Sequence, residues 1–144
     1  MEELQKAAKI AFASTFSFYL KAHNFHWNVE GVHFKQLHDL FEVIYSEVYG
    51  SIDDFAENIR KLQAYAPASL ERFSMLSTID DENGMPDTGG MIQELLGDSE
   101  KIIHVLKIVY DIAEREGKHG FSNFLAERMD AHEKHSWMLR SCLK

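Results

Sequence analysis

The chain has 144 residues, of which 45% are hydrophobic and 26% are charged, and its formal net charge at pH 7 is -8. This length and composition predict one domain over residues 1–144 that buries a real core, and the acidic balance argues against a strongly basic nucleic-acid-binding surface. The sequence has no membrane-spanning run, no basic opening of a signal peptide and a single cysteine, Cys142, so we expect a cytoplasmic protein.

Apolar residues recur three or four positions apart in four long segments, a pattern that predicts amphipathic helices. The first helix is expected over about 3–28, with Gly31 marking the turn that follows it. The second is expected as one rod from Phe34 to Leu62. Gly50 lies inside this rod, which suggests a close approach of two backbones there, at a two-fold contact near residues 45–50.

Proline and glycine residues interrupt the helical pattern after the second helix, over about 63–90. A short helix is expected within this connection, over 68–77. The third helix is then expected over 91–116 and the fourth over 121–143. Because a connection of this length is too long for a simple helical hairpin, the sequence predicts an all-α four-helix bundle whose middle connection spans the bundle.

Two pairs of metal-binding residue types lie on the first two predicted helices: His26 with His38, and Asp53 with Glu57. The two carboxylates are four residues apart and therefore face the same way. His38 and Asp53 lie on one rod, roughly 22 Å apart at about 1.5 Å of rise per residue. Since ligands of one ion each lie about 2 Å from it, one chain cannot complete the site. Two chains packed antiparallel about a two-fold axis would form two identical sites.

Two alternatives to a shared metal site come from the same sequence. A carboxylate pair four residues apart is also typical of a solvated helix face. A centre inside one bundle would use Glu-x-x-His pairs on facing helices, and the chain contains Glu30 with His33 and Glu116 with His119. Each of these pairs lies beside a glycine in a predicted turn, so we do not expect them to bind metal.

The remaining histidines are given simpler interpretations. His23 is interpreted as a residue of the helix surface, and His132 and His135 as surface or inter-subunit polar residues.

A set of residues with characteristic types and spacing runs along the first two helices and reappears later in the chain. The set consists of His26–Gly31, Phe34, Leu37–His38, Phe41–Glu42, Tyr45, Glu47, Asp53 and Ala56–Glu57, joined later by Gln93–Leu95 and Glu133–Leu139. This set resembles the core motif of the Dps family, the mini-ferritins. The resemblance extends over about residues 5–142.

The resemblance implies a ferritin-like four-helix bundle that assembles into a hollow shell of twelve subunits. Such shells oxidise Fe(II) at inter-subunit ferroxidase centres, commonly with hydrogen peroxide and otherwise with oxygen, and store the ferric product inside. The function implied is iron storage combined with protection against oxidative stress. Ligands of this kind would also accept Zn(II) or Mn(II).

Family positions can be carried over residue by residue. His26 and His38 would be iron ligands from one subunit, and Asp53 and Glu57 would come from its two-fold partner. Glu42 matches an acidic position at or just beyond the ligands. In the shell that the resemblance implies, Asp39 and Glu47 would be candidates for interior acidic residues that seed mineral, with ordinary solvation as the alternative.

Trp27 matches a tryptophan beside the centre that is proposed to intercept oxidising equivalents. Trp27 is therefore a candidate redox neighbour of the iron site.

Two features of the chain depart from the family pattern. Many Dps proteins bind DNA through a basic tail, which this sequence lacks, so we do not expect DNA binding; a DNA-compacting protein and a structural cage with little ferroxidase activity remain the alternatives. The stretch Lys118–Asn123 replaces acidic residues that line an iron pore in many members, which leaves the route of iron uptake open. Glu127 and Asp130 follow and would supply negative charge instead.

Overall fold

A computed structural model describes all residues 1–144 and contains helices but no strands. The six helices are α1 (Glu2–Asn28), α2 (Phe34–Gly50), α3 (Ile52–Lys61), α4 (Leu70–Leu76), α5 (Thr88–Arg115) and α6 (His119–Ser141). The predicted all-α class, the short helix in the crossover and the first, third and fourth long helices are thereby confirmed. No helix is both long enough and apolar enough to span a bilayer.

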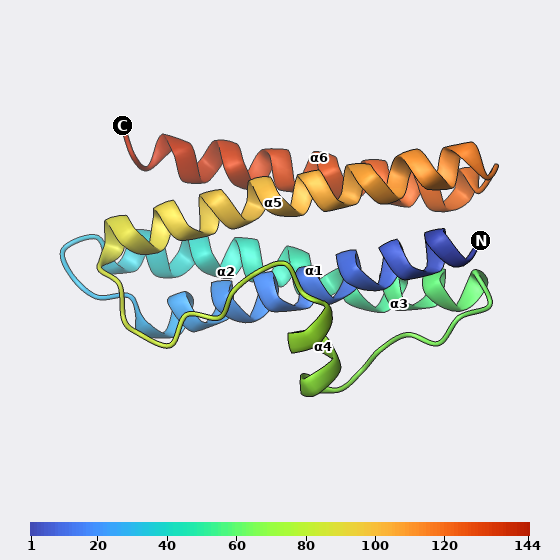
Figure 1. Cartoon of the computed structure of the whole chain (residues 1–144). Helices are drawn as coiled ribbons and strands as arrows, with labels where there is room; N and C mark the ends of the chain where they lie inside the picture. The colour runs from blue at the N-terminus through green and yellow to red at the C-terminus, as the bar shows by residue number, and fades with distance from the viewer.

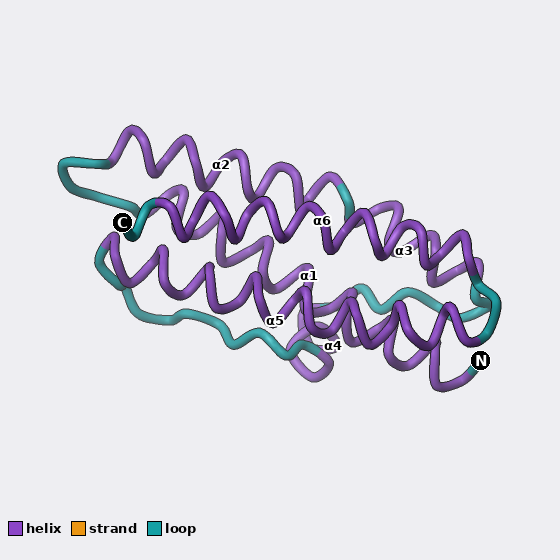
Figure 2. Tube along the Cα trace, turned by 90° about the horizontal axis from the view of Figure 1, so that it is seen from above, coloured by secondary structure: helices purple, strands orange, loops and turns teal.

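The long helices form a four-helix bundle with the chain termini at opposite ends (Figure 1). Helix α1 runs antiparallel to α2 and α3, and α5 runs antiparallel to α6. The crossover leaves the end of α3, carries α4 on the outside of α1, and returns along the bundle to the start of α5 (Figures 1 and 2). Because the crossover returns along the length of the bundle, α5 runs in the same direction as α2 and α3.

The second rod of the bundle is interrupted at Ser51, which corrects the expectation of one uninterrupted helix. The Ser51 hydroxyl donates a hydrogen bond to the Val48 carbonyl at 2.6 Å, and the Ser51 N–H also bonds to this carbonyl at 3.0 Å. A serine side chain that competes for a backbone carbonyl weakens the helical ladder locally. The ladder resumes at once, because the Phe55 N–H bonds to the Ser51 carbonyl at 3.0 Å.

The core is one continuous cluster of 28 buried residues that extends along the bundle. Its largest members are phenylalanines from α1, α2 and α3, including Phe18, Phe25, Phe41 and Phe55, each with 0% exposure. Burial of aromatic side chains from every part of the first hairpin stabilises α1 against α2 and α3, and holds the candidate ligands in place.

The crossover is attached to α1 by aromatic and polar contacts. Phe73 of α4 stacks on Phe16 with 4.4 Å between ring centroids and meets Phe12 edge-on at 5.8 Å. Further along, the Ser14 hydroxyl bonds to the Thr78 hydroxyl at 3.0 Å and accepts from the Thr78 N–H at 2.9 Å. These contacts fix the crossover at its middle and leave the opposite face of the bundle uncovered.

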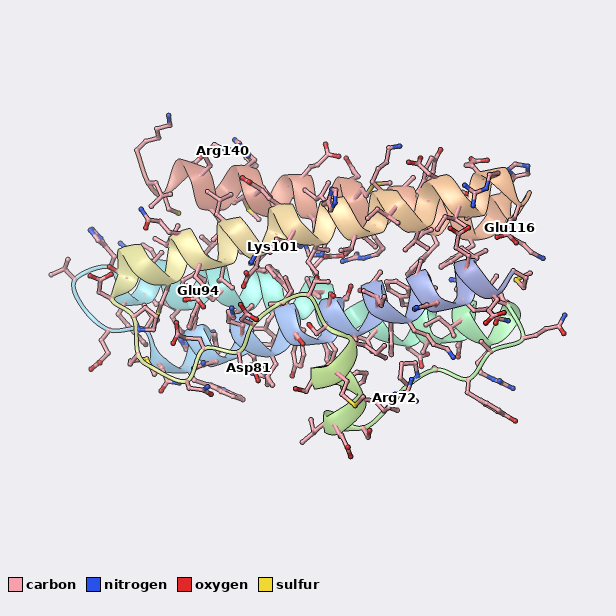
Figure 3. All side chains as sticks on the ribbon, in the orientation of Figure 1. Arg72, Asp81, Glu94, Lys101, Glu116 and Arg140 are labelled. Carbon is pink, nitrogen blue, oxygen red and sulfur yellow. The ribbon has the colours of Figure 1, made fainter.

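A buried ion pair connects α1 to α5. The Lys21 ammonium donates to Asp98 at 2.8 Å and to Glu94 at 2.9 Å; Figure 3 labels Glu94 on α5. Burial alone would lower the pKa of Lys21, but the hydrogen bonds to the two carboxylates outweigh it and raise the pKa above its ordinary value.

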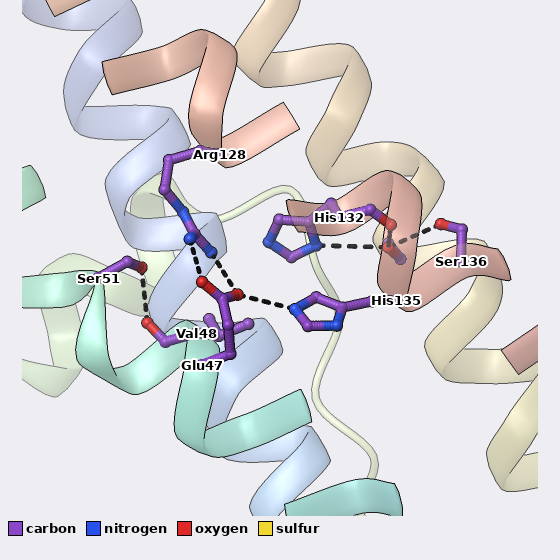
Figure 4. A network of polar contacts seen from close by, with 8 residues as sticks. Glu47, Val48, Ser51, Arg128, His132, His135 and Ser136 are labelled. Carbon is purple, nitrogen blue, oxygen red and sulfur yellow. Dashed lines mark hydrogen bonds and ion pairs between the residues drawn. The ribbon is translucent and has the colours of Figure 1, made fainter. Parts of the chain in front are cut away.

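A second polar network joins α2 to α6 and corrects the interpretation of His132 and His135. Both imidazoles are buried, with 0% and 2% exposure, because each has partners inside the bundle. His135 bonds through Nε2 to Glu47 at 2.8 Å, and Arg128 forms a two-point ion pair with the same carboxylate (Figure 4). His132 lies beside the Ser99 hydroxyl at 3.3 Å.

Glu47 is therefore held by its partners and is not a freely solvated acid. Its burial opposes ionisation, but the hydrogen bonds from His135 and Arg128 hold its pKa well below the ordinary value. This carboxylate stays ionised and serves the contact between α2 and α6.

Candidate metal centre

Two histidines face each other across the turn between α1 and α2. Nδ1 of His26 lies 2.7 Å from the carbonyl oxygen of His38, and Nδ1 of His38 lies 2.7 Å from the carbonyl oxygen of His26. The two rings stack with centroids 3.8 Å apart and an interplanar angle of 17°. We call this reciprocal arrangement the histidine clasp.

The histidine clasp determines where each ring carries its proton. A carbonyl oxygen can only accept a hydrogen bond, so Nδ1 of both His26 and His38 must carry hydrogen. In the neutral ring the lone pair then lies on Nε2, the atom that remains free to bind a metal. Histidine ligands of metals in proteins are oriented in this way, with one nitrogen bound to a carbonyl and the other to the ion.

The acidic residue Glu42 lies beside the clasp. Its Oε1 atom lies 4.0 Å from Nε2 of His26, on the nitrogen that the clasp leaves free. The Glu42 side chain is 56% exposed, whereas the His26 side chain is 10% exposed. Within one chain the structure thus brings together two imidazoles and one carboxylate.

The other carboxylates form a separate cluster on α3. Ligand atoms of Asp53, Asp54 and Glu57 lie within 4.8 Å of one another, and all three residues are exposed. No histidine belongs to this cluster. Within a single chain, therefore, the predicted histidine ligands and the predicted Asp53 and Glu57 ligands do not meet.

Several aromatic rings surround the histidine clasp. Tyr45 meets the His26 ring edge-on at 5.1 Å, and His23 stacks between Tyr45 at 3.8 Å and Trp27 at 3.9 Å. His23 is therefore half-buried in an aromatic stack and does not lie freely on the helix surface. Burial lowers its pKa, and the neighbouring His26 lowers it further.

Sequence reasoning did not identify Asp54 or Tyr19 as part of these clusters. Asp54 precedes Glu57 by three residues, a helical spacing that was available as a signal. Tyr19 precedes His23 by four residues, and its hydroxyl lies 2.9 Å from Nδ1 of His23. This contact follows from the same spacing rule once His23 is recognised as part of the site.

The alternative Glu-x-x-His pairs are not assembled into a bundle centre. Glu30 and His33 are both exposed in the turn before α2. Glu116 pairs with the amino group of Met1 at 2.8 Å, while His119 pairs with Glu114 at 2.7 Å. These residues cap the ends of the bundle.

The helical bundle, with histidine and carboxylate groups on its first hairpin, has the architecture of the ferritin-like class. A family model described as a ferritin-like domain matches residues 5–144. The DNA protection during starvation protein of Brevibacillus brevis is 32% identical over 126 residues, which cover 88% of this chain and 85% of that protein. General stress protein 20U of Bacillus subtilis is 31% identical over 142 residues, covering 99% and 98%.

Solved structures agree with these sequence relatives. Dps from Thermosynechococcus elongatus matches with a TM-score of 0.96 and 29% identity, covering 99% of this chain and 91% of that one. Dps from Vibrio cholerae O1, described as a member of a broad superfamily of ferritin-like diiron-carboxylate proteins, matches with a TM-score of 0.94 and 28% identity, covering 99% and 90%. The chain belongs to the Dps family of the ferritin-like superfamily. This membership supports a general function in iron storage and stress protection.

Proposed function

We propose that this protein is a cytoplasmic ferroxidase that binds Fe(II) between two protomers, oxidises it with hydrogen peroxide and stores the ferric product in a shell of twelve subunits. The observation that carries the proposal is the histidine clasp, which leaves Nε2 of His26 and of His38 free for a metal. Asp53 and Glu57 of the two-fold partner complete the site. Glu42 adds negative charge beside His26.

The chemistry of this donor set suits iron that changes its oxidation state. Two imidazole nitrogens and two carboxylates bind Fe(II), and they would also accept Zn(II) or Mn(II). Four protein ligands shared between the ions would leave coordination positions open for water and oxidant, and a catalytic metal site requires such open positions. In the proposed reaction each of two Fe(II) ions gives one electron to one hydrogen peroxide, which takes up two protons and leaves as two waters.

The outer face of α2 supports the two-fold arrangement. It exposes two large apolar side chains, with Val43 at 54% and Tyr49 at 58%. Around Gly50 the chain itself leaves open space, because a Cβ atom there would meet no heavy atom within 4 Å. A second copy packed on this face would bury the apolar residues and approach Gly50 closely.

Asp53 and its neighbour Asp54 provide a matched pair of variants that tests the proposed site. We expect Asp53→Asn to lower the rate of peroxide-driven Fe(II) oxidation at least about ten-fold, since loss of even an outer partner of a metal ligand costs 10- to 100-fold. Asp54→Asn removes the same charge one residue further around α3 and should retain most of the activity. Stopped-flow absorbance of the ferric product measures both rates.

Equal losses in the two variants would mean that general negative charge, rather than a ligand at Asp53, drives the reaction. A wild-type protein without ferroxidase activity would overturn the proposal and favour a structural cage. Size-exclusion chromatography of each variant controls for assembly.

We infer that direct compaction of DNA is not part of the function. A net charge of -8 for each chain repels a phosphate backbone, and non-specific DNA affinity comes mainly from neutralised phosphates. We therefore expect the iron-free protein to cause no gel shift of duplex DNA at low or moderate salt. A shift at low salt that disappears as salt rises would instead indicate a local basic surface.

A further inference from the structure

Trp27, His23 and Tyr45 form a continuous stack of three rings beside the histidine clasp. The His23 ring lies 3.9 Å from Trp27 with an interplanar angle of 31°, and 3.8 Å from Tyr45 with an angle of 10°. Tyr45 in turn meets His26 at 5.1 Å. Rings at these distances are in van der Waals contact, so electrons can pass between them over short gaps.

Tyr19 is attached to this stack through a hydrogen bond. Its hydroxyl lies 2.9 Å from Nδ1 of His23, and its ring meets the His23 ring edge-on at 5.6 Å. Burial raises the pKa of Tyr19 above its ordinary value, and the nearby Tyr49 and Tyr45 raise it further. Tyr19 is therefore a neutral phenol at physiological pH, with an imidazole as its hydrogen-bond partner.

Proton transfer distinguishes Tyr19 from the other tyrosines of the chain. A phenol that loses one electron becomes a strong acid and must give up its proton. Tyr19 is the one tyrosine whose hydroxyl bonds to an imidazole. The hydroxyls of the remaining four tyrosines make no hydrogen bond with the protein; they belong to Tyr45, Tyr49, Tyr65 and Tyr110.

We propose that Tyr19 and His23 form a one-electron redox site that receives oxidising equivalents from Trp27. Tyr19 gives one electron to the oxidised indole of Trp27 and its phenolic proton to the lone pair on Nδ1 of His23. The products are a neutral indole, a neutral tyrosyl radical and a protonated imidazole, so charge and atoms balance. Histidine commonly acts as a proton acceptor of this kind.

In the cell the oxidant of Trp27 would come from the iron chemistry of the site, so this part of the inference rests on the proposed ferroxidase function. When one Fe(II) reacts alone with hydrogen peroxide, it gives one electron and produces Fe(III), hydroxide and a hydroxyl radical. The radical takes one electron from Trp27 and becomes hydroxide. The Tyr19–His23 pair then holds the oxidising equivalent on side chains that are not metal ligands.

Azidyl radicals test the transfer in the iron-free assembled protein, because they oxidise indole directly. The chain has two tryptophans, so the Trp137→Phe background leaves Trp27 as the sole indole. Pulse radiolysis should show tryptophanyl absorbance that decays as tyrosyl absorbance rises. We expect a first-order rise that is independent of protein concentration and slower in D2O.

Three variants in this background identify the acceptor. Tyr19→Phe keeps the ring but should abolish the tyrosyl rise, whereas Tyr45→Phe keeps the stack and should leave the rise intact. His23→Gln should slow the rise at least about ten-fold, as expected for loss of a positioned base. Added imidazole should restore part of the rate. Tyr65→Phe, at an exposed position, is the matched control.

A tyrosyl rise that survives in Tyr19→Phe but is lost in Tyr45→Phe would overturn the proposal. So would a rise that depends on protein concentration, since the transfer would then occur between molecules. The measurement uses no iron and no peroxide, so its outcome does not depend on ferroxidase activity. An inactive ferroxidase with a normal tyrosyl rise would overturn only the proposed function.

Discussion

Particles co-refolded from equal amounts of His38→Ala and Asp53→Ala subunits should regain roughly a quarter of the wild-type rate of Fe(II) oxidation. Each variant alone should be inactive. Random pairing makes half of the two-fold pairs mixed. In a mixed pair one site carries both lesions, while the other combines an intact His38 with an intact Asp53. The rate is measured with peroxide as the oxidant.

The physical basis of this result is the separation of the ligands within one chain. His38 belongs to the clasp on α2, whereas Asp53 belongs to the carboxylate cluster on α3, which contains no histidine. A mixture that remains as inactive as its parents, with mixed pairing verified by mass spectrometry, would contradict the shared site. Co-refolding each variant with itself controls for losses during refolding.

Asp98→Ala should reduce the free energy of unfolding by about 3 kcal/mol, the lower end of the range for breaking a buried ion pair. The Lys21 and Asp98 side chains are 4% and 7% exposed, so Lys21 would remain in the core with Glu94 as its single partner. Urea unfolding at a fixed subunit concentration, monitored by circular dichroism, measures the change, since assembly also contributes to stability.

An exposed ion pair on the same helix provides the control. Lys107 and Asp111 are 57% and 56% exposed, and Asp111→Ala should change stability by at most about 0.5 kcal/mol. The double variant Lys21→Met, Asp98→Leu should be more stable than Asp98→Ala, because it leaves no buried charge unpaired. A similar loss in Asp111→Ala and Asp98→Ala would show that burial does not determine the effect.

Helix positions were predictable because hydrophobic spacing is a local signal. The predicted first helix over 3–28 corresponds to α1, and the short crossover helix predicted over 68–77 corresponds to α4. The interruption at Ser51 was not predictable in the same way. The apolar spacing continues through it, from Val48 to Ile52 and Phe55, while the interruption arises from one hydroxyl that bonds to a nearby carbonyl.

Polar contacts between residues far apart in the sequence cannot be predicted from the spacing of residues along a helix. His135 was interpreted as a surface or inter-subunit residue, yet its partner Glu47 lies 88 positions away in the sequence. His132 bonds to Ser99, which lies 33 positions away. A histidine is buried when the fold supplies such a partner, and no local pattern reveals which distant residue that will be.

The candidate site also has one part that the sequence predicts and one part that depends on the tertiary fold. The residue types and their helical spacing identify His26, His38, Asp53 and Glu57 as candidate ligands. The helical rise per residue shows that the two histidines lie too far from the two carboxylates to share an ion within one chain. The histidine clasp, by contrast, depends on carbonyl positions on both sides of a turn, and thus on the tertiary fold. The stack of His23 on Tyr45 likewise needs α1 and α2 to be docked.

The histidine clasp constrains the length of the turn over 29–33 but not the side chains in it. Both of its hydrogen bonds end on backbone carbonyls, so turn side chains take no part in them. Val32, at the tip, is 91% exposed. Substitutions at such a position can accumulate without disturbing the clasp. One inserted or deleted residue, however, would shift the His38 carbonyl along α2 relative to His26, and relatives that keep the clasp should therefore vary in this turn by substitution alone.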